Sequence, residues 1–158
     1  MQFQSSIQEA CYDRIAQWMH ELFGKFPCAR PDVPGLGIFK GSALVEVLVF
    51  PWGDDEAVIH TRSRVVQDVE LTSELMRFLL EENAKMLFGA FGIDSNGNIV
   101  FEHTIVGSTC DRKELEASVN AVLEVSDEYD DLICNKWGGQ RALDRLQVYS
   151  PNSEAPVS

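Results

Sequence analysis

A chain of 158 residues, 45% of them hydrophobic, is long enough to bury a core and fits one ordinary domain. Its 25 acidic residues outnumber the 13 basic ones, which gives a formal net charge of −12. Nucleic acid is therefore not an expected partner, because binding to it begins with Lys and Arg neutralising phosphates. An anionic membrane surface is disfavoured for the same reason, and a basic or apolar partner fits the charge better.

The first residues, MQFQSSIQEACYDR, contain neither the basic segment nor the apolar run of a signal peptide. No apolar stretch approaches the ~20 residues that a membrane span needs. The four cysteines, Cys11, Cys28, Cys110 and Cys134, are widely spaced and form no CxxC pair, which favours reduced thiols over a zinc site. We therefore expect a cytoplasmic protein.

Apolar residues recur with helical spacing from Ser6 to Lys25, which predicts an amphipathic helix ended by Gly24 and Pro27. The stretch ARPDVPG that follows has two prolines and predicts a linker without regular structure. Three strand candidates come next: LGIFKG, ALVEVLVF and AVIHTRSRVV. The second of these is apolar on both faces except at Glu46, which is typical of a central strand.

The third candidate strand alternates and carries His60, Arg62 and Arg64 on one face. If the turn PWGDDE centres near Asp54, Glu46 lies opposite Arg62 in an antiparallel pair, and a cross-strand ion pair results. A slip of one residue would instead give Arg62 a different neighbour.

Thr72 is the predicted N-cap of a second helix with the sequence SELMRFLLEENAK. The stretch MLFGAFGIDSNGNIVFEHTIV then predicts a β-hairpin, since its Asn-Gly step is a strong turn signal. A phosphate-binding loop must join a strand to a helix N-terminus, whereas GAFG lies within a strand. We expect its glycines to let a helix or a neighbouring backbone approach the sheet closely.

Asp111 is the predicted N-cap of a long helix that ends at the glycine pair after Trp137. Residues 142–148 are expected to add one helical turn, and residues 149–158 to form a disordered polar tail. The predicted order is α-β-β-β-α-β-β-α in a single α+β domain, residues 1–148. Its five-stranded, mainly antiparallel sheet packs against the long first and last helices.

No residue pattern indicates catalysis, and none calls for a cofactor or a metal. His103 shares a strand face with Phe101 and Ile105, which favours a core histidine with a hydrogen-bond partner over a general base. Cys110 precedes a helix N-terminus, where the pKa of a thiol can fall, but the sequence places no histidine to activate it. The acidic run SDEYDD lacks the pattern of an EF-hand and predicts a solvated helix face.

The stretch MLFGAFGIDSNGNIVFEHTIVGST, followed by a long helix containing SDEYDDLI and then GG, resembles the YbjN family of bacterial proteins. That family is grouped with the type III secretion chaperone-like fold, and the resemblance covers roughly residues 36–143. It implies a helix–sheet α+β domain, often dimeric, whose secretion-chaperone relatives bind extended protein segments. Members of the YbjN group mostly lack an assigned activity, and similar domains occur in cyanobacteria and chloroplasts.

The leading hypothesis is a non-enzymatic, protein-binding domain with chaperone-like or regulatory character, acting as a homodimer. Trp18, Phe50 and Trp52 are the predicted apolar contacts with a partner segment whose basic flanks meet the acidic surface. A dimer that only stabilises itself, with the binding surface elsewhere, is a further possibility.

The alternative hypothesis is a protein that binds a small anionic ligand, or hydrolyses one, with His60, Arg62 and Arg64. A preformed pocket on which these three side chains converge would favour this alternative. A flat apolar patch buried between two copies would favour the leading hypothesis instead.

Overall fold

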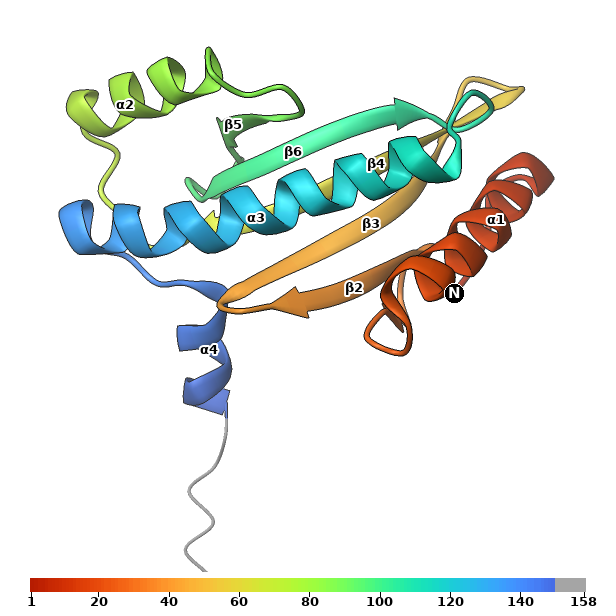
Figure 1. The fold of residues 1–158 in the computed structure, drawn as a ribbon, viewed down its shortest axis with the longest axis horizontal. Coiled ribbons are helices and arrows are strands. Elements are labelled where there is room, and N and C mark those ends of the chain that lie inside the picture. Colours follow the sequence, from red (N-terminus) through yellow and green to blue (C-terminus); the bar gives the residue numbers. More distant parts are fainter. Residues whose placement is uncertain (150–158) are drawn as a thin grey trace, which may run out of the picture.

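The computed structural model describes the backbone of residues 1–149 and the side chains of residues 1–145 (Figure 1). The described part confirms the α+β class expected from the sequence. The helices are α1 (Ser6–Phe23), α2 (Ser73–Asn83), α3 (Arg112–Trp137) and α4 (Ala142–Tyr149). The strands are β1 (Cys28–Ala29), β2 (Gly35–Lys40), β3 (Ala43–Trp52), β4 (Glu56–Val66), β5 (Ala90–Ile93) and β6 (Ile99–Val106).

The strands form one antiparallel sheet in the order β1-β2-β3-β4-β6-β5. The sheet has one strand more than the five expected, because β1 is only two residues long and too short to leave a sequence pattern. Helix α4 occupies the segment where one helical turn was expected. The disordered tail predicted for residues 149–158 lies outside the described residues from residue 150 onward.

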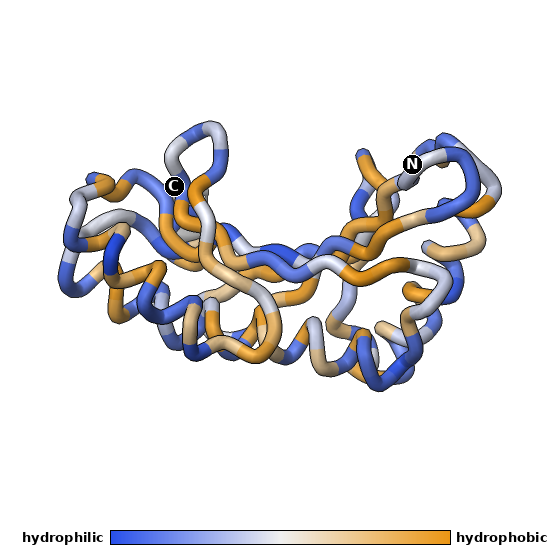
Figure 2. The backbone as a smooth tube through the Cα atoms, turned by 90° about the horizontal axis from the view of Figure 1, so that it is seen from above, coloured by the Kyte–Doolittle hydropathy of each residue, from blue (hydrophilic) through white to orange (hydrophobic). Residues whose placement is uncertain are grey.

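The long helices cover only one face of the sheet. α3 runs across β3, β4 and β6, while α1 packs against the other end of the same core (Figure 1). In Figure 2 the helices lie on the lower side of the sheet, and the upper side of the sheet is uncovered across its middle. We call this side the open face. Its side chains include Phe39, Leu44, Glu46, Phe50, Trp52, His60, Arg62, Arg64, Glu102 and Thr104.

Both predicted helix N-caps are confirmed. The side chain of Thr72 accepts a hydrogen bond of 3.1 Å from the N–H of Leu75 at the start of α2. Asp111 accepts one of 2.7 Å from the N–H of Glu114 at the start of α3. Each cap satisfies one of the backbone donors that a helix start leaves without a partner.

Gly89 lies just before β5 and not within a strand, and it allows the close approach that the sequence predicts, whereas Gly92 does not. Its φ is +80°, and a Cβ built there would lie 2.7 Å from the ring of Phe101 and 2.8 Å from the carbonyl oxygen of Glu102. No larger residue fits so close to β6 in this backbone conformation. The glycine therefore serves the packing of the sheet.

The acidic run on α3 is not a solvated face at two of its positions. Asp127 accepts hydrogen bonds from the N–H and the hydroxyl of Ser42, at 2.9 and 3.1 Å. Asp130 is only 1% exposed, and its Oδ2 lies 2.6 Å from the same hydroxyl, whose single proton the two carboxylates share. The carbonyl of Ser42 accepts from the N–H of Leu143 in α4 at 3.2 Å. The turn between β2 and β3 therefore joins α3 to α4.

Candidate functional site

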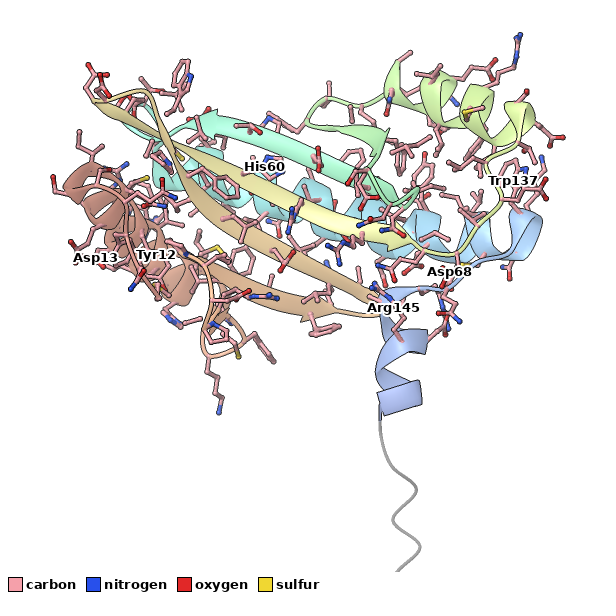
Figure 3. The ribbon with its side chains drawn as sticks, turned by 180° about the vertical axis from the view of Figure 1, so that it is seen from behind. Tyr12, Asp13, His60, Asp68, Trp137 and Arg145 are labelled. Carbon is pink, nitrogen blue, oxygen red and sulfur yellow. The ribbon has the colours of Figure 1, made fainter. Side chains whose placement is uncertain are left out.

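Five of the six side chains predicted to contact a partner or an anionic ligand lie on the open face. Phe50 and Trp52 stand exposed at the β3–β4 hairpin, while His60, Arg62 and Arg64 follow along β4. Figure 3 looks onto this face, with His60 over the middle of the sheet and α3 behind it. The sixth, on α1, lies apart from them.

That sixth residue, Trp18, packs half-buried against the core, with the guanidinium of Arg14 5.4 Å from its ring centroid. The helical spacing of α1 made it a plausible surface contact, but the helix covers the opposite side of the sheet from the open face. Trp18 and the open-face residues cannot act as one surface.

The predicted ion pair between Glu46 and Arg62 is confirmed. The two residues are direct partners in the β3–β4 register, and Arg62 Nε lies 3.1 Å from Glu46 Oε2. The second carboxylate oxygen of Glu46 lies 2.8 Å from Nη1 of Arg30, which comes from the loop after β1. Glu46 therefore bridges two guanidiniums on the open face.

His60 does not converge on a pocket with the two arginines. Its Nδ1 lies 2.8 Å from Thr104 Oγ1, and its Nε2 lies 3.5 Å from Glu102. A pocket does exist next to Arg62 and Arg64, but His60 does not line it. The arrangement that would favour the alternative hypothesis is therefore only partly present.

One edge of the sheet, at β5, is blocked at Phe91 by a side chain. Asn83, the last residue of α2, accepts a hydrogen bond of 2.6 Å from the N–H of Phe91 and donates one of 3.1 Å to its carbonyl. The carboxamide thus takes the place that a further strand would occupy at this position.

The other edge, at β2, is only half covered. β1 pairs Cys28 with Gly37, and the N–H of Arg30 donates to the carbonyl of Gly35 at 2.9 Å. Because hydrogen-bonding groups of successive residues point to alternate sides of a strand, Phe39 directs its N–H and C=O outward as Gly35 and Gly37 do.

Continuing this register would place Phe26 opposite Phe39, but that pair does not form. The N–H of Phe26 donates instead to the carbonyl of Phe23, at 3.4 Å. Among residues 1–149, no hydrogen bond reaches the N–H or the C=O of Phe39. The edge of β2 is therefore open at this residue.

An apolar hollow of about 610 Å³ lies beside the open edge, between the end of α1, β2 and α3. A second hollow, of about 300 Å³, shares Phe26 and Phe39 with the first and continues over Leu44 toward Arg30. Phe26 is 72% exposed, so its ring stands in water between the two hollows. Such exposed apolar surface is typical of an interaction site. The first hollow is lined by Leu22, Phe23, Gly24, Phe26, Ile38, Phe39, Lys40, Asn120 and Leu123.

A second apolar surface, which we call the α2 patch, lies at the opposite edge. Leu80 is its most exposed member, at 70%. The α2 patch consists of Met76, Leu80 and Ile93, which line one shallow hollow.

The groups that could carry catalysis are held in structural roles. Nδ1 of His103 lies 2.8 Å from Ser118 Oγ on α3, as expected of a core histidine, and burial lowers the pKa of its ring. Burial raises the pKa of the Cys110 thiol to about 12, opposite to the fall that a helix N-terminus can cause. The Cys110 thiol is therefore protonated at neutral pH, and the His103 ring is paired with the buried Ser118.

Within residues 1–149, no three His, Cys, Asp or Glu side chains come together as a metal site. No helix in that part of the chain is both long and apolar enough to cross a bilayer.

The fold is similar to that of a chain in the crystal structure of the ExsC–ExsE complex, with which it superposes at a TM-score of 0.60. The match covers 81% of this chain and 96% of that one at 15% sequence identity, so it concerns the fold.

A family model described as "T3SS (YopN, CesT) and YbjN peptide-binding chaperone 1" matches residues 9–145. The chain therefore belongs to this family of peptide-binding chaperones, and the resemblance to YbjN proteins is confirmed. The family and the fold point to a protein-binding role rather than to an enzyme, and they give no support to the alternative hypothesis. Comparison with curated proteins finds no match.

The sequence carries a weak signal for the open edge and none for part of the open face. Phe39 alternates with the buried Leu36 and Ile38, so it could have been placed on the outer side of an edge strand. Nothing in the sequence places Arg30 beside Arg62, because 31 intervening residues and two strands separate them.

Proposed function

We propose that the chain is a non-enzymatic, cytoplasmic chaperone that binds an extended segment of another protein along the free edge of β2. The observation that carries this proposal is the outward N–H and C=O of Phe39, which face no partner beside an apolar hollow. Membership of a peptide-binding family supports it, and the similar crystal structure is that of a complex, ExsC–ExsE.

The bound segment would add a strand to the sheet. Its backbone would pair with Phe39, where the register of β1 stops, and this pairing is independent of the segment's sequence. Alternate side chains of a strand point to opposite faces, so one set would enter the hollow that Phe26 and Phe39 border. Specificity would then come from the size and polarity of those side chains.

Two predicted contact residues would extend the surface along the open face. Phe50 and Trp52 are exposed at its far end, and the ring of Phe50 lies 6.2 Å from that of His60. We propose them as secondary contacts for a long bound segment. Trp18 is not part of this proposal, because it packs against the core on the other side.

We also propose that the protein forms a homodimer through the α2 patch. Self-association of a chain with a net charge of −12 requires a contact surface that does not repel its copy. The α2 patch meets this requirement, because each acidic residue of α2 has a cationic partner. The pairs are Glu74 with Lys136 at 3.1 Å, Glu81 with Arg77 at 3.9 Å and Glu82 with Lys85 at 2.6 Å.

The edge contact is tested by comparing Phe39→Ala with Phe39→Pro. Both variants lose the ring, but only proline also loses the outward N–H, and neither breaks a bond to β3. Peptides selected from a displayed random library serve as ligands, and fluorescence anisotropy measures their affinity. We expect Phe39→Pro to bind about tenfold more weakly than Phe39→Ala, the value of one strong hydrogen bond.

Thermal unfolding by circular dichroism checks that both variants remain folded. Equal affinity of the two variants would show that the ligand does not pair with the edge. A library that yields no ligand for the wild-type chain would contradict peptide binding itself.

A further inference from the structure

Four of the chain's eight arginines line one pocket of about 280 Å³ on the open face. Arg30 comes from the loop after β1, Arg62 and Arg64 from β4, and Arg145 from α4. Figure 3 shows Arg145 where α4 meets the sheet, at one end of the open face. We call this site the arginine pocket, and its local charge contrasts with the net charge of −12.

The two carboxylates that line the arginine pocket are both engaged on one side of it. Glu46 lies between Arg30 and Arg62, at 2.8 and 3.1 Å. Asp32 lies 3.4 Å from Nε of Arg30 and is mostly exposed. Glu46 and Asp32 therefore neutralise Arg30 and Arg62. The guanidiniums of Arg64 and Arg145 have no carboxylate partner within the arginine pocket.

The remaining pair is poorly neutralised. Arg64 is 3.9 Å from a carboxylate oxygen of Asp94, which is too long for a hydrogen bond. Nε of Arg145 is shielded from solvent and has no hydrogen-bond partner among the described residues. Burial and the neighbouring charge of Arg64 lower the pKa of Arg145, although Asp68 opposes this. A shielded cation beside a second cation is costly unless an anion lies between them.

The fold fixes the backbone at Arg145 without help from an anion. The N–H of Leu143 donates to the carbonyl of Ser42, and Ser42 is in turn bonded to Asp127 and Asp130 of α3. α4 is therefore anchored to the sheet one turn or less before Arg145. A site whose backbone is fixed in advance loses less entropy on binding than a mobile one.

The arginine pocket is continuous with the smaller apolar hollow. Arg30 and Leu44 line both cavities, and the hollow extends from them to Phe26 and Phe39. A ligand that reaches from the open edge into the pocket must therefore be apolar at one end and anionic at the other. A strand with an acidic side chain near an apolar one has this chemistry.

We propose that the arginine pocket binds the carboxylate of an aspartate or glutamate in the client segment. The planar guanidiniums of Arg64 and Arg145 match the two oxygens of a carboxylate. A carboxylate bound between them would balance their positive charges. This inference rests on the proposed function, since it names the kind of segment that the edge of β2 accepts. The bound segment would be recognised through its own acidic residue, even though the chaperone as a whole is acidic.

The test uses the full chain and a set of blocked octapeptides of alternating valine and threonine. One glutamate is moved through the eight positions, and glutamine replaces it in matched controls. Proton–nitrogen correlation spectra follow the Nε–H of Arg145 and the backbone N–H of Phe39 during each titration. We expect at least one glutamate peptide to shift both signals and to bind about tenfold or more tightly than its glutamine control.

Arg145→Gln and Arg64→Gln should each remove most of this advantage without changing the affinity for the glutamine peptide. Arg112→Gln makes the same charge change at an exposed arginine of α3 and should leave the advantage intact. Equal affinity of glutamate and glutamine peptides at all positions would overturn the inference, as would the absence of any shift at Arg145.

Two further outcomes separate this inference from the proposed function. If glutamate peptides shift Arg145 but not Phe39, the arginine pocket stands and the strand addition fails. If only glutarate or inorganic phosphate shifts Arg145, the pocket takes a free small anion, and the inference about clients is wrong.

Discussion

The hydroxyl of Ser42 donates a hydrogen bond of 2.6 Å to Oδ2 of Asp130, a carboxylate whose residue is only 1% exposed. The other oxygen, Oδ1, has no hydrogen-bond partner among the described residues. Burial raises the pKa of Asp130 to about 6, and the nearby charges of Asp131 and Asp127 add to this effect. A buried acid with one unmatched oxygen is more stable when it is protonated.

The stability of the protein should therefore depend on the protonation of Asp130. Its folded-state pKa of about 6 lies above the unfolded value of about 3.9, so the folded state binds more protons between these pH values. Below pH ~4 the titration of Asp130 does not change the free energy of unfolding. As the pH rises toward 6, the ionisation of Asp130 lowers that free energy. We expect Asp130→Asn to be more stable than the wild type by on the order of 1–3 kcal/mol at pH 8.

Urea unfolding at pH 4 and pH 8 measures this difference. Glu128→Gln changes the same charge on an exposed position of α3 and should follow the wild-type pH profile. A stability difference for Asp130→Asn that is the same at both pH values would contradict the assignment.

The closure of the β5 edge predicts a large cost for Asn83→Ala. The variant removes both partners of the Phe91 backbone and leaves a buried residue with an unpaired N–H and C=O. We expect a loss of about 1–3 kcal/mol in the free energy of unfolding, measured by urea denaturation. Asn96→Ala, in the exposed β5–β6 turn, should cost less than about 0.5 kcal/mol. Similar costs for the two variants would show that the carboxamide does not support the edge.

The proposed dimer predicts that Leu80→Glu is a folded monomer. Leu80 is 70% exposed, so the change leaves the core intact but puts a charge into the α2 patch. Light scattering coupled to size-exclusion chromatography gives the mass, which we expect to fall from about twice 17.7 kDa to 17.7 kDa. Leu132→Glu, at an exposed leucine on α3, is the control and should remain dimeric. A wild-type chain that is itself monomeric would refute the dimer.

The cysteines should differ sharply in reactivity. Cys28 is exposed, whereas Cys11 and Cys110 are buried and burial raises the pKa of both thiols. Reaction of the native protein with a chromogenic disulfide should thus show one fast thiol, which Cys28→Ser removes. A fast phase that persists in Cys28→Ser would mean that the partly buried Cys134 or a buried thiol is accessible.

Local patterns allowed much of the fold to be predicted. The alternation of the strands and the position of one turn placed Glu46 opposite Arg62, and the structure confirms that register. The N-caps Thr72 and Asp111 were readable because a cap depends on residues within one turn of it. Features of this kind are determined within a few residues of the chain.

The parts that could not be predicted depend on contacts between distant segments. Asp130 belongs to a run of acids that looks solvated, and only the packing of the β2–β3 turn against α3 buries it. Arg145 lies 81 residues after Arg64, yet α4 brings it to the same pocket. Net charge likewise predicts the average charge of the surface and not the charge of one face. Composition therefore cannot reveal a basic pocket in an acidic chain.

The closure of one sheet edge by Asn83 also limits how copies of this protein can join. A sheet with two open edges can be extended at both ends, and repeated pairing then produces a fibre. Here the outward groups of Phe91, on the strand next to α2, are occupied, whereas those of Phe39 on β2 face no partner. The two edges are therefore unequal, which disfavours the repeated edge-to-edge pairing that a fibre needs.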